Sequence, residues 1–256
     1  MDAEMKVIFN ADDFGLTRGV NDGIVHAHLD GVVRSTTMMV GMPAEAHAVE
    51  LANHLPELKV GLHLRFTAGR PLTEEQNLVG RDGDFTPYGQ FWHRRDYDPI
   101  AIHNEAVAQV EYFLALGLNL SHIDSHHHAH THPQFEPIIY DIARTYQVPL
   151  RSTGLAGEEE FGCRYHFTAH FYDKRVGHDS LIQHLLTLKD HYDVVEVMCH
   201  PAIVDTALEA CSGYAKQREL ELAILTSDEL KLSLRKHDIE VTDYSELIFA
   251  PLHSCV

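Results

Sequence analysis

Short runs of apolar residues alternate along this chain with longer segments in which apolar residues recur every three or four positions. A run of about four to eight apolar residues is typical of a buried strand, whereas the wider spacing is typical of an amphipathic helix. Strands are predicted over 6–10, 32–42, 59–64, 120–124, 148–152, 193–199 and 239–241. Helices are predicted over 20–29, 44–54, 100–116 and 179–191, within 133–146, and as a pair within 214–237.

Residues at the ends of these segments support the predicted helix boundaries. Gly31 and Gly117 each follow a predicted helix, at the position where a glycine commonly caps the C-terminus. Pro56 follows another helix, which therefore ends before it. Near the end of the chain, Thr226 or Ser227 could cap the second helix of the predicted pair.

Two segments have no clear period and are interpreted as irregular. Residues 65–99 are rich in Gly, Pro and Asp, and residues 154–177 form a second, aromatic-bearing insertion. An irregular segment as long as the first is usually functional or mobile in a compact domain. We therefore expect residues 65–99 to cover a functional site.

Alternation of strands and helices predicts the fold class. Repeated β-α units predict a mostly parallel sheet, which right-handed crossovers wind either into a barrel or into an open layer. The chain has no internal repeat, no G-x-G-x-x-G after the first predicted strand, and no G-x-x-x-x-G-K-[ST] motif. Dinucleotide binding and a P-loop are therefore not supported. A single domain that spans residues 1–256 is the simplest organisation.

Composition and charge narrow the class of protein further. Of the 256 residues, 45% are apolar and 23% are charged, which is ordinary for a globular protein and excludes a disordered or collagen-like chain. The net charge of -18 disfavours nucleic acids and anionic membranes as partners. The N-terminus has no apolar signal region, and no run of about eighteen apolar residues occurs. We expect a cytoplasmic protein.

Cysteine chemistry is not expected to define the function. The four cysteines form no C-x-x-C pair and have no zinc-finger spacing, so they are interpreted as reduced thiols. Cys199 and His200 are neighbours in an extended segment and therefore point to opposite faces. Because no G-x-S-x-G motif is present either, the sequence favours neither a cysteine nor a serine nucleophile.

Polar chemistry is concentrated in the stretch 122–132, which contains six histidines and one aspartate. Each imidazole has two ring nitrogens that need partners once water is removed, so apolar packing alone does not explain the stretch. If the strand that ends near this point stays extended, its two-residue period places on one face Asp124, His126, His128 and His130. The alternative is a His-rich surface loop.

Other polar residues also occur at the ends of predicted strands. They are Asp12 and Asp13 after the first strand, His63 at the third, His126 and His128 after the fourth, Arg151 at the fifth, and His200 after the sixth. The strand ends of a β/α barrel meet on one face, where active sites form. We therefore expect these side chains to lie together.

This set of residues indicates metal-dependent chemistry. A carboxylate and two imidazoles are a common ligand set for a catalytic divalent cation, and Asp13, His63 and His126 can supply it. If Asp13 is a ligand, Asp12 stays available as a general base, and His200 could be the general acid. Each residue also has a structural interpretation. His63 could be a core histidine, the aspartate pair a turn or cap, and His200 a histidine without a catalytic task.

Five motifs, in order along the chain, resemble those of a known family. They are Asn10-Ala-Asp-Asp-Phe-Gly15, Ser35-Thr-Thr37, Gly61-Leu-His63, His122-Ile-Asp-Ser-His-His-His-Ala-His130 and Met198-Cys-His-Pro201. In this combination the chain resembles the YdjC-like carbohydrate deacetylases of the chito-oligosaccharide deacetylase type. The match spans residues 6 to about 201, and each motif alone is short.

The resemblance implies a fold and an activity. The fold is an α/β, single-domain distorted (β/α) barrel of the polysaccharide-deacetylase-like type. The activity is that of a metal-dependent hydrolase, which cleaves the linear amide C–N bond of N-acetylated carbohydrates such as chitobiose-like oligosaccharides. The resemblance also implies a homodimer.

It further implies roles for five residues, and the residue pattern adds one for His200. The metal would be held by Asp13, His63 and His126, and Asp12 would be the base. Arg151 would orient Asp12, as an arginine does in related polysaccharide deacetylases, and His200 would protonate the departing sugar amine. Family members are commonly assigned Mg²⁺, whereas two imidazoles suit Zn²⁺ or a similar ion, so the identity of the divalent cation stays open.

Several alternatives stay open. A metal-dependent phosphoesterase could use the same ligands, although no cationic cluster for phosphate is obvious, and a His-rich metal-binding protein would bind several ions through residues 126–132. The particular acetylated sugar, and whether it is phosphorylated, are not predicted. Aromatic residues of the 65–99 segment could stack on sugar rings or could pin the segment to the protein. These residues are Phe85, Tyr88, Phe91 and Trp92.

Overall fold

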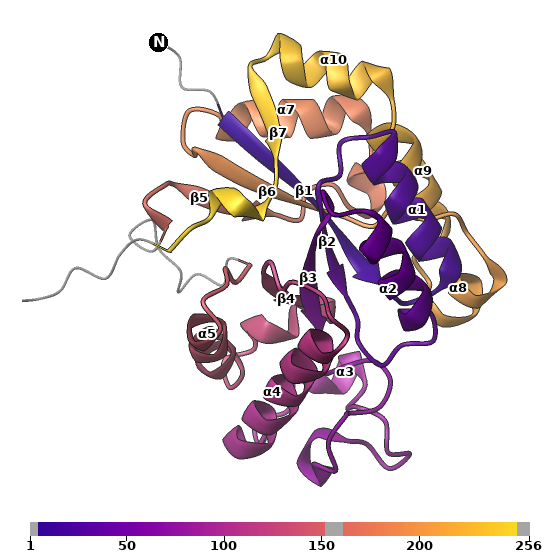
Figure 1. Ribbon diagram of the computed structural model, residues 1–256, viewed down its shortest axis with the longest axis vertical. Helices are drawn as coiled ribbons and strands as arrows, with labels where there is room; N and C mark the ends of the chain where they lie inside the picture. The colour runs from indigo at the N-terminus through magenta and orange to yellow at the C-terminus, as the bar shows by residue number, and fades with distance from the viewer. Residues whose placement is uncertain (1–4, 152–160, 250–256) are drawn as a thin grey trace, which may run out of the picture.

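The computed structural model describes residues 5–151 and 161–249, which form a curved parallel sheet flanked by helices (Figure 1). Its strands are β1 (Met5–Phe14), β2 (Ser35–Met38), β3 (Lys59–Leu64), β4 (Ile123–Ser125), β5 (Tyr165–Thr168), β6 (Val194–Cys199) and β7 (Ile239–Thr242). The order across the sheet is β4-β3-β2-β1-β6-β5. On the side of β1 opposite β6, β7 pairs with its first half and β2 with its second half.

Nine helices in the described ranges accompany this sheet. They are α1 (Arg18–Leu29), α2 (Glu45–His54), α3 (Tyr88–Phe91), α4 (Pro99–Ala115), α5 (Glu136–Thr145), α7 (His178–Leu188), α8 (Thr206–Cys211), α9 (Lys216–Leu225) and α10 (Asp228–Lys236). Short 3₁₀ helices are η1 (Gln76–Leu78), η2 (His126–Thr131), η3 (Asp173–Arg175) and η4 (Tyr244–Glu246). Helix α1 packs on β1 with α2 and α9 beside it, α4 packs on β3 and α5, and α10 packs on α7 and β7 (Figure 1).

The central strands lie inside the protein. All six residues of β6 are buried, as are nine of the ten residues of β1. A parallel sheet covered on both faces needs continuous apolar strands rather than alternating ones, and the apolar runs of β1 and β6 meet this need. The exceptions are few, and they include Glu196 in the middle of β6 and Asn10, Asp12 and Asp13 in the second half of β1. The predicted α/β barrel class is confirmed, with the sheet forming a half-barrel.

Most predicted boundaries agree with the structure to within a few residues. The predicted cap at Ser227 is confirmed, because its hydroxyl accepts the Leu230 N–H at the start of α10. The strand predicted over 148–152 is wrong for its described residues, because Leu150 forms only an isolated bridge with Ile123. Pro149 has no backbone N–H and therefore cannot donate a hydrogen bond that would extend the pairing. Ser152 lies outside the described residues.

The fifth strand of the sheet, β5, lies instead inside the segment predicted to be irregular. Its four residues alternate too briefly to give a clear period, and three of them are only half-buried at the sheet edge. The short helix α8 was not predicted either. Within the described ranges, no helix combines the length and apolar character needed to cross a membrane.

Candidate active site

Asp12 and Asp13 lie within the last part of β1 rather than in a loop after it. The pairing register with β2 shifts between Ala11 and Phe14, and Asp13 has a φ of 73°. Neighbouring residues of a regular strand point to opposite faces, but this bulge and the left-handed conformation change the direction of one of them. Both carboxylates therefore line the same cavity of about 930 Å³.

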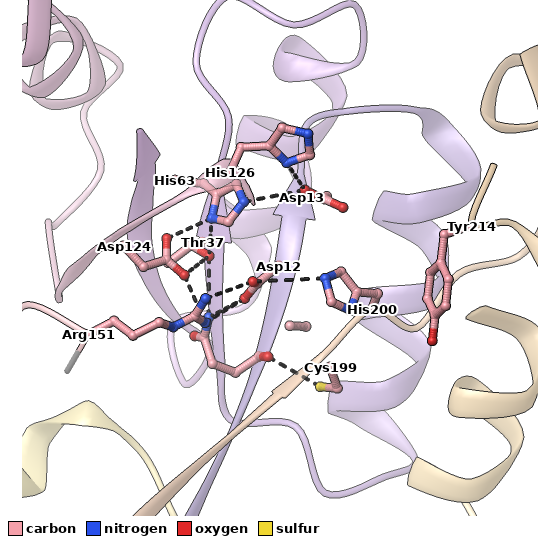
Figure 2. A network of polar contacts seen from close by, with 12 residues as sticks. Asp12, Asp13, Thr37, His63, Asp124, His126, Arg151, Cys199, His200 and Tyr214 are labelled. Carbon is pink, nitrogen blue, oxygen red and sulfur yellow. Dashed lines mark hydrogen bonds and ion pairs between the residues drawn. The ribbon is translucent and has the colours of Figure 1, made fainter. Parts of the chain in front are cut away.

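Asp13, His63 and His126 converge at this cavity (Figure 2). Asp13 Oδ1 lies 2.9 Å from His126 Nδ1 and 3.4 Å from His63 Nε2. Three potential ligand atoms, one from each residue, lie within 4.8 Å of one another. One carboxylate oxygen and two ring nitrogens that face a common point fit a divalent cation with open positions.

The carboxylate of Asp124 fixes the orientation of His63. Asp124 Oδ1 lies 2.7 Å from His63 Nδ1, which leaves Nε2 directed toward Asp13. Burial opposes a protonated His63, but Asp124, Asp13 and Asp12 outweigh burial and raise the pKa of His63 to about 10. A cation at this position would take the place of that proton. Such a carboxylate–histidine pair is the usual outer support of a metal ligand.

Asp124, Asp12 and His63 also bring ligand atoms within 4.8 Å of one another. The carboxylate oxygens of Asp12 and Asp124, however, already bind Arg151. Asp12 accepts two hydrogen bonds from Arg151, at 2.7 and 2.8 Å, and Asp124 Oδ2 lies 2.8 Å from Arg151 Nη2. The group that contains Asp13 is therefore the better candidate for a cation.

Arg151 is fully buried beside Asp12 (Figure 2). Its Nε donates to Glu196 at 2.8 Å. Asn10 also donates to Asp12 Oδ1 at 2.9 Å. Burial disfavours the charged form of Asp12, but the Arg151 guanidinium outweighs burial and holds the pKa of Asp12 well below its usual range. Asp12 is therefore an ionised carboxylate at the wall of the cavity.

His200 follows the end of β6 and faces Asp12 across the cavity. Its Nε2 lies 3.9 Å from Asp12 Oδ2 (Figure 2). Burial and the nearby Arg218 guanidinium lower the pKa of His200 to about 3. The six residues predicted from the sequence thus lie together, with five of them lining the cavity and Arg151 directly behind.

The predicted comb of histidines on one extended face is wrong. The chain leaves the strand conformation after Ser125 and enters η2, where His127 and His128 have positive φ values of 56° and 55°. His126, His127 and His128 line the cavity, whereas His130 is buried and bonded to Ser125 Oγ at 2.5 Å.

His132 and His122 are also buried, and His122 stacks on Tyr244 with ring centres 3.5 Å apart. The surface-loop interpretation of the stretch 122–132 is therefore wrong. In the described part of the chain, His126 belongs to a group of three potential metal ligands. None of residues 127–132 belongs to such a group there. This placement argues against a metal-storage protein that would bind several ions through the stretch.

The 65–99 segment reaches the cavity through residues near its start and through Tyr88. Tyr88 is 51% exposed, and its ring lies 4.5 Å from that of His127. Trp92 does not line the cavity and packs against Phe91 and His132 instead. Of the two interpretations of these aromatic residues, pinning describes Trp92 and Phe91, and only Tyr88 is placed to contact a ligand.

Two charged residues of α9 belong to this site but were not predicted. Arg218 Nη2 donates to Asp13 Oδ2 at 2.7 Å, and Glu221 accepts the backbone N–H of His200. Both side chains are buried and lie three residues apart, so they project from the same helical face. In the sequence they resemble the ordinary charged residues of a surface helix. Their spacing does place them on one helical face, but spacing alone does not show whether that face is buried or exposed to solvent.

The half-barrel and its carboxylate–histidine cluster place this chain among proteins with the fold of the polysaccharide deacetylases. A CE4 family pseudoenzyme mutant with restored activity shares the fold, with a TM-score of 0.50 at 12% identity, over 96% of this chain and 68% of that one. A crystal structure from Enterococcus faecalis V583, whose name refers to cellobiose-phosphate cleavage, is more similar. Its TM-score is 0.88 at 33% identity, over 96% of this chain and 100% of that one.

The family model described as YdjC-like protein matches residues 6–236, and the chain belongs to this family. Relatives from two genera carry the name carbohydrate deacetylase. One from Vibrio vulnificus (strain CMCP6) is 99% identical over 98% of this chain and 100% of its own length. One from Brevibacillus brevis is 43% identical over 95% of this chain and 100% of its own length.

Proposed function

We propose that this protein is a metal-dependent hydrolase that removes acetyl groups from N-acetylated carbohydrates. The observation that carries the proposal is the position of an ionised carboxylate, Asp12, between a candidate cation site and His200. The names of relatives that are up to 99% identical support the same substrate class.

Asp13, His63 and His126 are the residues that would hold the divalent cation. Such a cation supplies Lewis-acid chemistry, because it polarises a carbonyl group and lowers the pKa of water. Mg²⁺ is the ion implied by the family resemblance, whereas two imidazole ligands favour Zn²⁺ or a similar ion. Metal content of the purified protein, and reactivation of the stripped protein by single ions, would identify it.

Asp12 would act as the general base. It removes one proton from the attacking water while a new bond forms between the water oxygen and the acetamide carbon. Arg151 donates to both oxygens of Asp12, so it fixes the direction of the carboxylate and keeps it ionised. Asn10 restrains the same group from a third direction.

His200 would act as the general acid. As the C–N bond breaks, its electron pair stays on nitrogen, which takes a proton from His200 and leaves as the sugar amine. Acetate is the second product. The proton that Asp12 gained from water equals the one that His200 lost, so proton transfer between these residues or through solvent restores both for the next turnover.

The cavity suits a small sugar rather than a polymer. Its volume of about 930 Å³ lies within the usual range for small-molecule sites. Tyr88, Tyr172 and Tyr214 line it and offer both apolar ring faces and hydroxyl groups, as sugars require. We propose a chitobiose-like or related small N-acetylated oligosaccharide, with phosphorylated and unphosphorylated forms to be compared directly.

A screen of acetylated mono- and oligosaccharides, read as acetate released with and without chelator, tests this function. We expect release that chelator abolishes and that added divalent cation restores. 4-Nitrophenyl phosphate tests the phosphoesterase alternative in the same samples. Hydrolysis of the phosphate ester without release of acetate from any sugar would reverse the assignment.

We also propose a homodimer, on the family resemblance, and a cytoplasmic location, on the composition of the chain. Light scattering coupled to size-exclusion chromatography should give twice the 28.9 kDa mass of one chain. A mass of one chain at micromolar concentration would contradict the dimer.

A further inference from the structure

The imidazole of His200 lies between two carboxylates. Its Nε2 is 3.9 Å from Asp12 Oδ2, and its Nδ1 is 3.9 Å from Glu221 Oε1. Glu221, on α9, is fully buried, and its Oε2 accepts the backbone N–H of His200. Its Oε1 accepts the hydroxyl of Tyr214 at 2.5 Å. One carboxylate therefore holds the backbone of His200 and also lies beside the ring nitrogen that faces away from Asp12.

We propose that Glu221 is a positioning residue for the reaction, which fixes His200 at the end of β6 and stabilises the imidazolium that gives its proton to the leaving amine. This inference rests on the function proposed above. His200 Nδ1 is buried and has no hydrogen-bond partner in the described part of the chain. A buried cation without a compensating charge is costly, and Glu221 is placed to supply that charge.

Other titratable and charged groups also face this pair. They are Asp12, Asp13 and His63 across the cavity, Cys199 on β6, Tyr172 and Tyr214 beside the imidazole, and Arg218 on α9. Arg218 opposes a positive charge on His200, and the two aspartates are each bonded to an arginine. Glu221 instead accepts hydrogen bonds from a backbone N–H and a tyrosine, and its carboxyl group is not bonded to a guanidinium in the described part of the chain.

Burial acts on the two partners in opposite directions. It lowers the pKa of His200 to about 3 and raises the pKa of Glu221 to about 8. Below about pH 8 the proton is therefore held by Glu221, and the neighbouring imidazole of His200 is neutral. Transfer of that proton from Glu221 Oε1 to His200 Nδ1 gives an imidazolium beside a carboxylate. As the C–N bond breaks, Nε2 gives its proton to the amine nitrogen, which leaves a neutral imidazole and the carboxylate of Glu221.

Glu221 could instead only anchor the end of β6 to α9. The two roles differ in their dependence on the leaving group. An amine must be protonated as it leaves, whereas the 4-nitrophenolate of 4-nitrophenyl acetate leaves without a proton. Loss of a group that supports the acid therefore slows amide cleavage selectively, whereas a general distortion slows both reactions.

The test uses Glu221→Gln in the metal-loaded protein, because glutamine keeps the size and one acceptor oxygen. We expect kcat/KM for the acetylated sugar to fall about 10²-fold while that for 4-nitrophenyl acetate changes less than about threefold. The basic limb of the pH profile for the sugar should move to lower pH, since His200 alone holds its proton less well. In a His200→Ala background, Glu221→Gln should have no further effect on the ratio of the two rates.

Glu105→Gln is the matched control. Glu105 is also fully buried and accepts backbone N–H groups, from Leu72 and Thr73, but it belongs to α4. We expect it to change both reactions by the same factor. An equal fall of both rates in Glu221→Gln would overturn the inference, whereas a wild-type protein that releases no acetate from any sugar would overturn the proposed function instead.

A second measurement is made on the wild-type protein and does not depend on activity. The ring nitrogens of His200 in wild-type protein labelled with ¹⁵N-histidine should show a change in chemical shift near pH 8, where the adjacent Glu221 loses its proton. His200→Gln would identify the signals. No response above about pH 6 would contradict an interaction between the Glu221 carboxyl group and the His200 ring, whatever the kinetic result.

Discussion

Arg218 and Asp13 form a buried ion pair, in which Arg218 Nη2 donates to Asp13 Oδ2 at 2.7 Å. The other oxygen of Asp13 faces His63 and His126. Arg218 therefore leaves one oxygen of Asp13 for a cation and restrains the carboxylate through the other. Burial disfavours the charged form of Asp13, but Arg218 outweighs burial and keeps its pKa well below its usual range.

Replacing Arg218 by methionine should make the stability of the protein depend more strongly on the cation. Loss of one partner of a buried ion pair costs about 3 kcal/mol, because the remaining charge is uncompensated. A divalent cation beside Asp13 would supply the missing positive charge. Thermal unfolding would be measured with chelator and with excess Mg²⁺ or Zn²⁺. With chelator, Arg218→Met should have a lower Tm than the wild type. When cation is added, the Tm of Arg218→Met should rise by more than that of the wild type.

Arg70→Met is the control for this experiment. Arg70 pairs with Asp84 at 3.0 Å on the exposed surface, where an ion pair contributes at most about 1 kcal/mol. Its Tm should respond to cation as the wild type does. Equal rises in Arg218→Met and wild type would show that the Arg218–Asp13 pair is not coupled to cation binding.

His63→Ala or His126→Ala should remove tight metal binding and deacetylation while the chain stays folded. Each variant loses one of three candidate protein ligands, which should lower metal affinity at least about 10-fold and in most cases far more. Metal content after gel filtration and acetate release would be measured on the same samples. His127→Ala, next to His126 but outside the ligand group, should keep its metal. Full metal content in both ligand variants would mean that the cation binds elsewhere.

Tyr88 and Trp92 should behave differently on substitution. Tyr88 lines the cavity, and loss of a stacked ring should weaken sugar binding by about 1 kcal/mol, or about fivefold in KM, with little change in Tm. Trp92 packs between Phe91 and His132, so Trp92→Ala should lower the stability by about 2–3 kcal/mol and leave KM near that of wild type. A large rise in KM for Trp92→Ala alone would reverse the two roles.

The parts of the site that could be predicted are those that depend on strand ends. His63 and His200 lie at or after clear apolar runs, and the ends of parallel strands must meet on one face. The turn of η2 could not be predicted, because nothing in a run of histidines shows where the strand stops and positive φ begins. The bulge that brings Asp12 and Asp13 to one cavity is a tertiary feature of the same kind.

Arg218 and Glu221 could not be predicted for a different reason. A charged residue on an amphipathic helix usually faces water, and the sequence of α9 does not show which of its faces turns toward Asp13 and His200. Burial of these two side chains follows from contacts with Asp13 and His200, which come from parts of the chain that are distant in sequence. Their place in the site is therefore a property of the tertiary packing.

Asp12→Asn and Asp13→Asn should separate the proposed base from the proposed ligand. Asp13→Asn should loosen the metal, because it removes a charged ligand from the group with His63 and His126. Asp12→Asn should keep the metal and lower kcat by about 10²–10⁴, the usual contribution of a general base. Metal content and kcat would be measured on both variants. Equal metal loss in the two, or near-normal turnover in Asp12→Asn, would contradict the assignment.

The pH profile gives the same test a second readout. Arg151 holds the pKa of Asp12 below its usual range, so Asp12 is ionised and active as a base above that low pKa and loses activity only as the pH falls through it. Arg151→Lys keeps a positive charge but cannot donate two parallel hydrogen bonds, so it should raise the pKa of Asp12 and move the acidic limb of kcat/KM to higher pH. In Asp12→Asn that limb should flatten, because the group that it reports is gone. An acidic limb that stays in place in both variants would mean that another residue is the base.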